Sequence, residues 1–210
     1  MKYISKKEAK KMDNDLLNMG FEITSLIELA GHAAFEVIQK IIDKNYNGDL
    51  KIIILVGPGN NGSDGLVIAR YLKFVGHEVY VISEKINHLH LFTICKNLNI
   101  KMVTFDNMIN IKPDYVIDAL FGFSFRLPLM EPYVSIIKKY INEKIISIDV
   151  PTGYEIDNEN ITGEFIPIAV IAFGAPKLCS KKLKTYVVKS FFPQKCIANI
   201  QNYKEYEIIE

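Results

Sequence analysis

The sequence predicts an α/β fold, a Rossmann-like three-layer αβα sandwich with a mainly parallel central sheet. Strand-length runs rich in Val and Ile alternate with helical segments along most of the chain. Most of these runs are apolar throughout, which is typical of strands covered on both faces. Their βαβα order with short connections indicates a doubly wound sheet.

The N-terminal part of the chain predicts two helices before the first strand. Ser5 precedes Glu8 at the spacing of a capping box, and a helical pattern continues to about Met19. Gly20 can end this helix. Apolar residues then recur every three or four positions across 24–41, which predicts a second helix with one apolar face.

From residue 51 onward, strands and helices alternate. We expect strands at 51–57, 78–83, 100–104, 114–118, 145–149, 167–173 and 184–190, and helices at 63–75, 88–97 and 130–142. No linker rich in Pro, Gly or Ser divides the chain, so we expect a single domain over 1–210. We predict no helix or strand in the tail from Phe191 onward.

The composition narrows the possible partners and locations. The chain has 210 residues and a net charge of +1, which argues against a nucleic-acid partner because such binding needs a basic excess. No apolar stretch is long enough to span a membrane. The N-terminus resembles neither a signal peptide nor a transit peptide, so we expect a cytoplasmic protein. The 3 cysteines predict neither a disulfide framework nor a zinc site.

The first candidate site is the Gly-rich turn 57–65, Gly-Pro-Gly-Asn-Asn-Gly-Ser-Asp-Gly, directly after a predicted strand. Such a turn, leading into a helix, offers free backbone N–H groups to a phosphate. Asp64 would repel a phosphate, so we expect it to cap the helix or to bind a hydroxyl or a cation. The turn also fits G-x-G-x-x-G, with Glu84 about twenty residues on, which is the pattern of a dinucleotide-binding dehydrogenase.

Two further turns follow predicted strands and carry acids. Asp118 begins the turn 118–122, and Asp149 begins the turn 149–153, in which Thr152 adds a hydroxyl. An acid at a strand end can act as a general acid or base, a cation ligand or a helix cap. Because ligands of parallel sheets bind at the carboxyl ends of the strands, we expect the three turns to line one pocket.

Two more segments are candidates for the same pocket. The segment 122–128 combines two aromatic residues with Arg126, which can pair with a phosphate or pyrophosphate. The alternative is an ordinary surface loop with both aromatic residues packed down. Lys177 follows another predicted strand and is a further candidate for reaching the pocket.

Taken in order, these motifs resemble the NAD(P)H-hydrate epimerases, the YjeF N-terminal domain family. The resemblance covers nearly the whole chain and rests on residues 28–31, 57–65, 118–122, 131–133, 149–153 and 173–177. It implies an isomerase that interconverts the R and S epimers of hydrated NADH and NADPH at C6 of the nicotinamide ring. This reaction repairs the cofactor, because a separate, S-specific dehydratase that uses ATP or ADP then restores it.

The resemblance also implies the roles of individual residues. Substrate contacts fall on Asn60, Asn61, Gly62, Ser63, Asp64, Gly122, Phe123, Ser124, Phe125, Arg126, Leu127, Pro128 and Asp149. Asn61, Asp118 and Thr152 would hold a potassium ion, and their hard oxygens suit a monovalent cation. Asp149 would be the catalytic acid/base. The resemblance further implies a homodimer, and we expect no fused dehydratase domain.

The chain departs from the family pattern in a few places. Ser63 stands where a second glycine is usual, and Thr152 replaces the usual serine but keeps the hydroxyl. The segment 127–129 lacks the polar residues expected there. Two other functions remain open: a non-catalytic scaffold or binding module of the same fold, and a Rossmann NAD(P)-dependent oxidoreductase. The retained acids Asp64, Asp118 and Asp149 favour catalysis over the scaffold.

Overall fold

A computed structural model describes residues 3–42, 49–84, 89–107, 111–188, 191–193, 195–196 and 207–209. The strands are β1 Lys51–Val56, β2 Glu78–Ser83, β3 Lys101–Thr104, β4 Tyr115–Ala119, β5 Ile145–Ile148, β6 Ala169–Phe173, β7 Thr185–Val188 and β8 Glu207–Ile209. They form one sheet in the order β3-β2-β1-β4-β5-β6-β7-β8. Strands β1 to β7 pair in parallel, and only β8 runs antiparallel to its neighbour.

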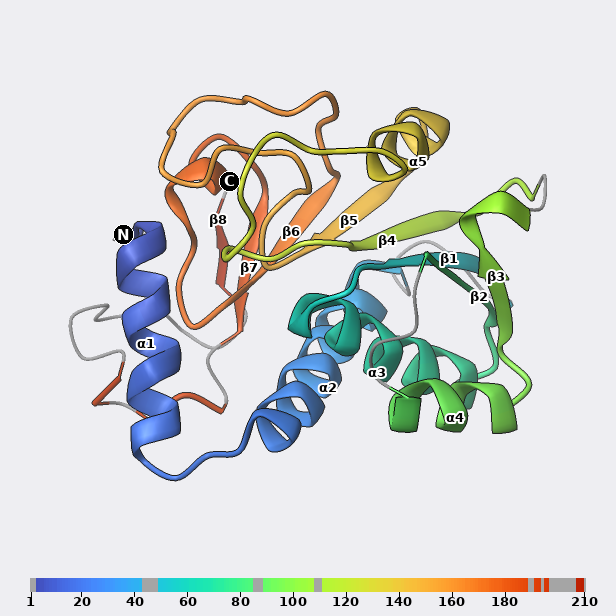
Figure 1. Ribbon diagram of the computed structural model, residues 1–210, viewed down its shortest axis with the longest axis horizontal. Coiled ribbons are helices and arrows are strands. Elements are labelled where there is room, and N and C mark those ends of the chain that lie inside the picture. The colour runs from blue at the N-terminus through green and yellow to red at the C-terminus, as the bar shows by residue number, and fades with distance from the viewer. Residues whose placement is uncertain are drawn as a thin grey trace.

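Helices cover both faces of this sheet. They are α1 Lys6–Asn18, α2 Ile23–Ile42, α3 Asn60–Phe74, α4 Leu89–Asn97 and α5 Tyr133–Tyr140, with short 3₁₀ turns at Phe105–Asn107 and Leu178–Ser180. Figure 1 shows α2, α3 and α4 on one face and α5 on the other. The predicted three-layer sandwich is therefore confirmed. None of the helices in the described parts of the chain is long and apolar enough to cross a membrane.

Strand β1 shows why the strand sequences are apolar throughout. Ile52 and Ile54 pack in the core cluster under α2 and α3, whereas Ile53 and Leu55 pack in the cluster under α5. All four side chains are buried. Successive side chains of a strand point to opposite faces, so a strand covered on both faces needs an apolar residue at every position.

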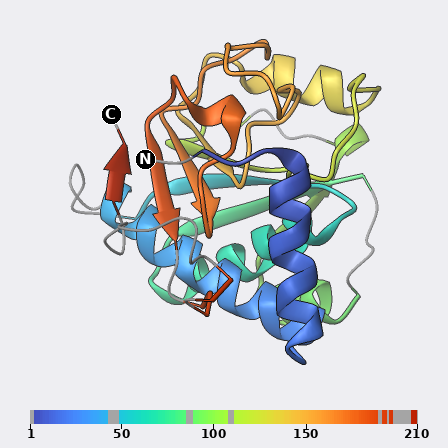
Figure 2. The same cartoon turned by 90° about the vertical axis from the view of Figure 1, so that its left-hand side faces the viewer.

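Helix α1 stands apart from the two helical layers. Figure 2, which shows the molecule from the side of α1, places this helix across the end of the sheet rather than on a face. The capping box predicted at its start is present, because the Ser5 hydroxyl accepts from the Glu8 N–H and the Glu8 carboxylate accepts from the Ser5 N–H. This arrangement gives hydrogen-bond partners to the backbone N–H groups of Ser5 and Glu8 and fixes where α1 begins.

The largest differences from the sequence prediction are the start of α3, the length of α5 and the presence of β8. Helix α3 begins at Asn60 rather than at 63, because Gly59 is its N-cap in an extended conformation and its carbonyl accepts from the Ser63 N–H at 3.2 Å. Helix α5 is shorter than 130–142, since Pro132 is its N-cap and the residue before a proline is disfavoured in helical conformation. Strand β8 was not predicted at all. Positions 88 and 189–190 of the predicted elements lie outside the described residues.

Candidate functional site

The first two strand-end turns are in backbone contact. Gly57 donates its N–H to the Ala119 carbonyl at 3.1 Å. A Cβ on Gly57 would lie 1.7 Å from the Leu120 carbonyl oxygen, and one on Gly62 would lie 1.9 Å from the Gly57 carbonyl oxygen. Only glycine permits such close approach of backbone to backbone. Gly57 therefore fixes the position of the first turn against the second, and Gly62 keeps the first turn tightly closed.

The third turn meets the other two at Gly122. A Cβ there would lie 2.9 Å from Asp149 Oδ2 and 3.5 Å from the Asn61 Cβ. Gly122 of the second turn thus lies close to one residue of each of the other two turns. The three turns line one cavity, as the sequence predicted.

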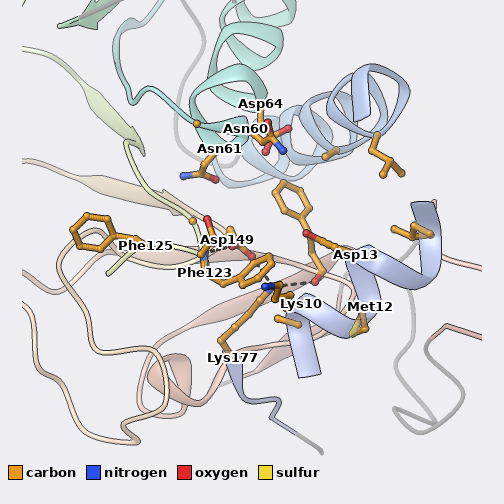
Figure 3. Close-up of a pocket in the computed structure, with 18 of the residues that line it drawn as sticks. Lys10, Met12, Asp13, Asn60, Asn61, Asp64, Phe123, Phe125, Asp149 and Lys177 are labelled. Carbon is orange, nitrogen blue, oxygen red and sulfur yellow. Dashed lines mark hydrogen bonds and ion pairs between the residues drawn. The ribbon is translucent and has the colours of Figure 1, made fainter. Parts of the chain in front are cut away.

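The cavity measures about 580 Å³ and has two walls of different origin (Figure 3). The strand-end wall consists of lining residues 59–61, 64, 120–126 and 149. The helical wall consists of lining residues from α1 and from the first half of α2. A volume of this size falls within the range of small-molecule sites.

Asp149 is the acid of the strand-end wall and is held from several directions. Its φ is 67°, a left-handed conformation that few residues other than glycine adopt. Its Oδ2 accepts from the Phe123 N–H at 2.8 Å, and its Oδ1 pairs with Lys177 Nζ at 2.5 Å. Lys177 also donates to the Phe173 carbonyl at 3.1 Å. Donors on both oxygens suit an ionised carboxylate.

Asp118 lies behind the cavity and is not among its lining residues. It is completely buried. Its carboxylate accepts from the Ser147 hydroxyl at 2.9 Å, from the Leu120 N–H at 3.3 Å, and from the Thr152 N–H and hydroxyl at 2.9 and 2.6 Å. Burial raises its pKa, and these hydrogen bonds oppose that rise. Asp118 thus ties the turn after β4 to β5 and to the turn after β5.

Asn61 is the least satisfied polar side chain of the site. It is 8% exposed, and neither its Oδ1 nor its Nδ2 has a hydrogen-bond partner. The Ser63 hydroxyl, in the same helical turn, is also buried without a partner. A buried polar group without a partner costs about 1–3 kcal/mol. Because Asn61 lines the cavity, its free amide indicates a place where a ligand binds.

The predicted potassium ligands fit a monovalent cation in their chemistry. Asn61 has an oxygen without a partner. Thr152 donates its hydroxyl hydrogen to Asp118, which leaves lone pairs on the hydroxyl oxygen. Among the described residues, no group of three or more His, Cys, Asp or Glu side chains could hold a metal. A set with one acid, one amide and one hydroxyl is of a different kind, so the potassium site stays a prediction.

Asp64 does not cap helix α3, contrary to one of our expectations. It is the fifth residue of the helix, whose N-cap is Gly59. Burial raises its pKa well above the usual value, and the charges of Asp149 and Asp13 add to the rise. A neutral carboxyl can donate a hydrogen bond and does not repel an anion. The raised pKa favours the neutral carboxyl, which weakens the objection that Asp64 would repel a phosphate.

Some of the residues predicted to contact the substrate line the cavity, and others do not. Residues 122–126 line it, with Arg126 exposed and Phe125 packed against Phe121 at 4.3 Å between ring centroids. Leu127 and Pro128 are exposed and are not among the lining residues. Gly62 and Ser63 are buried in the first turn of α3 and do not line the cavity either. Contacts from these four residues stay predictions.

The sequence did not identify Asp13, which the structure places in the helical wall. Loss of water around its carboxyl raises its pKa to about 6, the charge of Asp149 adds to this, and the charge of Lys177 opposes it. The segment before α1 reaches the same region, because Ile4 exchanges backbone hydrogen bonds with Pro176 and Leu178 on either side of Lys177. Asp13 sits in a polar helical stretch without a motif, so no sequence signal could have marked it.

The comparisons with known proteins agree on one family. The sequence model of the family described as YjeF-related protein N-terminus matches residues 23–179. A relative from Dictyostelium discoideum, named NAD(P)H-hydrate epimerase, is 37% identical over 92% of this chain and 87% of its own. A relative of the same name from Entamoeba histolytica is 34% identical over 100% of this chain and 98% of its own. The protein in the crystal structure of yeast ynu0, YNL200c, is 26% identical in sequence to this chain. The two structures superpose with a TM-score of 0.88 over 100% of both chains.

Proposed function

The chain belongs to the YjeF-related protein N-terminus family, and on this premise we propose that it is an NAD(P)H-hydrate epimerase. This isomerase interconverts the R and S epimers of hydrated NADH and NADPH at C6 of the nicotinamide ring. The observation that carries the proposal is the meeting of Asn61, Gly122 and Asp149 in one cavity. Neither the scaffold alternative nor the oxidoreductase alternative gains support from the relatives' names.

The chemistry at C6 needs an acid/base group close to the hydroxyl. The C6–O bond breaks as the hydroxyl takes up a proton and leaves as water, and the lone pair of N1 forms a C6=N1 double bond. Water then adds to the opposite face of C6, gives up a proton and reforms the C6–O bond. Each proton transfer needs a carboxyl or a similar group within hydrogen-bond reach. Asp149 is our candidate, because it lines the cavity and is fixed by Lys177 and the Phe123 N–H.

Other residues of the strand-end wall bind and orient the substrate. The free amide of Asn61 donates and accepts hydrogen bonds, and the carboxyl of Asp64, whose pKa is raised by burial, offers a further hydrogen-bonding group. The start of α3, with its free N–H groups, is suited to a phosphate of the dinucleotide. Arg126 is exposed at the cavity and carries the charge for a second phosphate.

A potassium ion forms part of the proposal. Asn61, Asp118 and Thr152 would hold it, and the ion would supply positive charge that links the three turns. The support is that the amide oxygen of Asn61 has no partner and that Asp118 and Thr152 carry hard oxygens in the other two turns. We expect activity to fall when potassium is replaced by tetramethylammonium, and an Asn61→Ala variant to lose most of this dependence. Equal activity of the wild type in both salts would contradict the cation site.

The remaining parts of the proposal concern partners and location. A separate dehydratase that uses ATP or ADP would consume the S epimer, and the protein would act as a cytoplasmic homodimer. Support for the dehydratase is the chemistry of the product, because epimerisation alone does not remove the added water. Sedimentation would test the homodimer directly.

The experiment that tests the activity starts from the isolated R-hydrate of NADPH. The protein is added together with an S-specific dehydratase, and the return of NADPH absorbance is followed. We expect rapid conversion by the wild type and its loss in Asp149→Asn. Asp15→Asn is a matched control, since Asp15 pairs with Lys11 on the outer side of α1 and does not line the cavity. A folded wild type that does not epimerise the hydrate would refute the proposed function.

A further inference from the structure

Asp13 brings a second carboxyl to the cavity from a separate wall. It lies in the third turn of α1, whereas Asp149 follows β5 in the strand-end wall. Figure 3 shows Asp13 projecting from α1 into the cavity, toward Asp149 and Lys177, which come from other segments of the chain. Asp13 is exposed and lines the cavity, so a ligand in the cavity can reach it.

The position of Asp13 is fixed by contacts at the start of α1. The Ser5 capping box begins the helix. The Lys6 ammonium donates to the Phe125 carbonyl of the strand-end wall, and the Lys6 N–H donates to Asp157 at 2.7 Å. One turn above these contacts, Ala9 and Met12 pack with Ala175 in a small apolar cluster. The helical wall is thereby joined to the strand-end wall on the side where Asp13 lies.

The charged groups around Asp13 come from several elements. Those that line the same cavity are Lys6 and Lys10 of α1, Asp64 of α3, Arg126, Asp149 and Lys177. Lys177 already pairs with Asp149 at 2.5 Å and donates to the Phe173 carbonyl. Asp13 thus faces the Asp149 charge without an ion pair of its own among the described contacts. Loss of water and the Asp149 charge raise its pKa to about 6.

The reaction itself calls for a group on each face of the ring. Epimerisation moves the hydroxyl from one face of C6 to the other, so a proton is delivered on one face and removed on the opposite face. A single carboxylate fixed in one wall can serve only the face that it borders.

We propose that Asp13 is the second acid/base of the site and serves the face of the nicotinamide ring opposite to Asp149. The inference rests on the proposed epimerase function. In one direction Asp13 protonates the departing hydroxyl, the C6–O bond breaks, and N1 forms a double bond to C6. Water adds on the other face, the new C6–O bond forms, and Asp149 takes the proton. The reverse reaction uses the two carboxyls in the opposite order.

A second observation indicates that the cavity binds a ligand near Asp149. The Asn61 amide is 8% exposed, lines the cavity and has no partner for either of its polar atoms. Its Cβ and Cγ lie 3.5 and 3.6 Å from where a Cβ on Gly122 would stand, next to Asp149. A substrate group that hydrogen-bonds the Asn61 amide therefore lies near Gly122 and Asp149, in the cavity that α1 also lines.

The test separates inversion at C6 from exchange of its hydroxyl. Each epimer of NADPH hydrate is incubated in ¹⁸O-labelled water with the wild type, Asp13→Asn, Asp13→Glu or Asp15→Asn, and both epimerisation and label uptake are measured. We expect Asp13→Asn to lose epimerisation by a factor of about 10² to 10⁴, the range of general acid/base catalysis. The Asp13→Asn variant still exchanges the C6 hydroxyl with labelled water, but only in the epimer whose hydroxyl faces Asp149. Asp13→Glu recovers part of the rate, and Asp15→Asn behaves like the wild type.

The pH profile provides a readout that a structural role of Asp13 would not change. We expect kcat/KM of the wild type to fall as the pH rises through about 6, and this limb to be absent from the residual activity of Asp13→Asn. Wild-type epimerisation by Asp13→Asn would overturn the inference. Equal loss of exchange for both epimers, without recovery in Asp13→Glu, would also overturn it. A wild type without any activity would instead refute the proposed function.

Discussion

The two walls of the cavity are built in different ways. The strand-end wall is fixed by backbone contacts, with Gly57 and Gly62 closer to neighbouring carbonyls than any other residue allows. Its acid, Asp149, is buried and paired with a buried lysine. The α1 part of the helical wall depends on one capping box, a few hydrogen bonds and a small apolar cluster. The strand-end wall thus holds its groups in fixed positions, whereas α1 encloses the cavity through fewer contacts.

The difference matters for a substrate as large as a dinucleotide. A site that positions one ring needs fixed groups, and these lie at the strand ends, where the sheet holds them. The ligand must also enter and leave, and a wall with few contacts opens at lower cost than one made of interlocked backbone. The following predictions test this comparison, beginning with the largest expected effect.

Breaking the buried ion pair between Asp149 and Lys177 in the strand-end wall should cause the largest loss of stability. Lys177→Met or Asp149→Asn leaves the partner charge buried and unpaired, which costs about 3–5 kcal/mol. The double variant should recover most of this loss, although it remains inactive. Chemical denaturation gives the three free energies of unfolding. The exposed pair Lys11–Asp15 of α1 is the matched control, and its double-mutant coupling should stay below about 1 kcal/mol.

The close backbone approach at Gly57 should come next. Gly57→Ala places a Cβ 1.7 Å from the Leu120 carbonyl oxygen, so the first two turns must separate. We expect a loss of about 3 kcal/mol of stability together with loss of activity. Gly59→Ala is the control, because no atom lies within 4 Å of its Cβ position. Similar melting temperatures for the two variants would show that the turns are less tightly joined than the structure indicates.

The cap of α1 should have a smaller effect, confined to the helical wall. Ser5→Ala removes the acceptor for the Glu8 N–H and costs about 1 kcal/mol. Because α1 forms one wall of the cavity, we expect KM to rise several-fold with little change in the melting temperature. Ser5→Asp, which keeps a capping oxygen, should restore KM. Unchanged kinetics in Ser5→Ala would mean that the helical wall contributes little to substrate binding.

The smallest effect concerns the stability cost of Asp13. Its pKa is raised from the usual value near 4 to about 6, so the folded state binds this proton more tightly than the unfolded state does. Stability is therefore lost as the pH rises through that window. Asp13→Asn removes the penalty, by about 1 kcal/mol or less because the side chain is exposed. Melting curves should show that the stability of Asp13→Asn relative to the wild type increases as the pH rises from 4 to 7. A constant difference across this range would contradict the raised pKa.

Several parts of the site could be predicted because local sequence determines them. Strand β1 and the turn after it are marked by an apolar run followed by glycines, and such a pattern depends on neighbours in sequence only. The start of α3 was placed three residues too late, because an Asn-rich segment is typical of turns as well as of first helical turns. Lys177 was only one candidate among several lysines, since its buried partner lies 28 positions away.

The sequence by itself determined the αβα sandwich, the strand-end turns and the family to which they belong, because periodicity and local motifs are properties of neighbouring residues. The tertiary structure alone decided that α1 closes the cavity and that Asp13 faces Asp149. It also decided which acid stands behind the cavity, Asp118, and which lines it, Asp149. The pKa values and partners of these carboxyls depend on burial and on charges from distant segments, which no local pattern encodes.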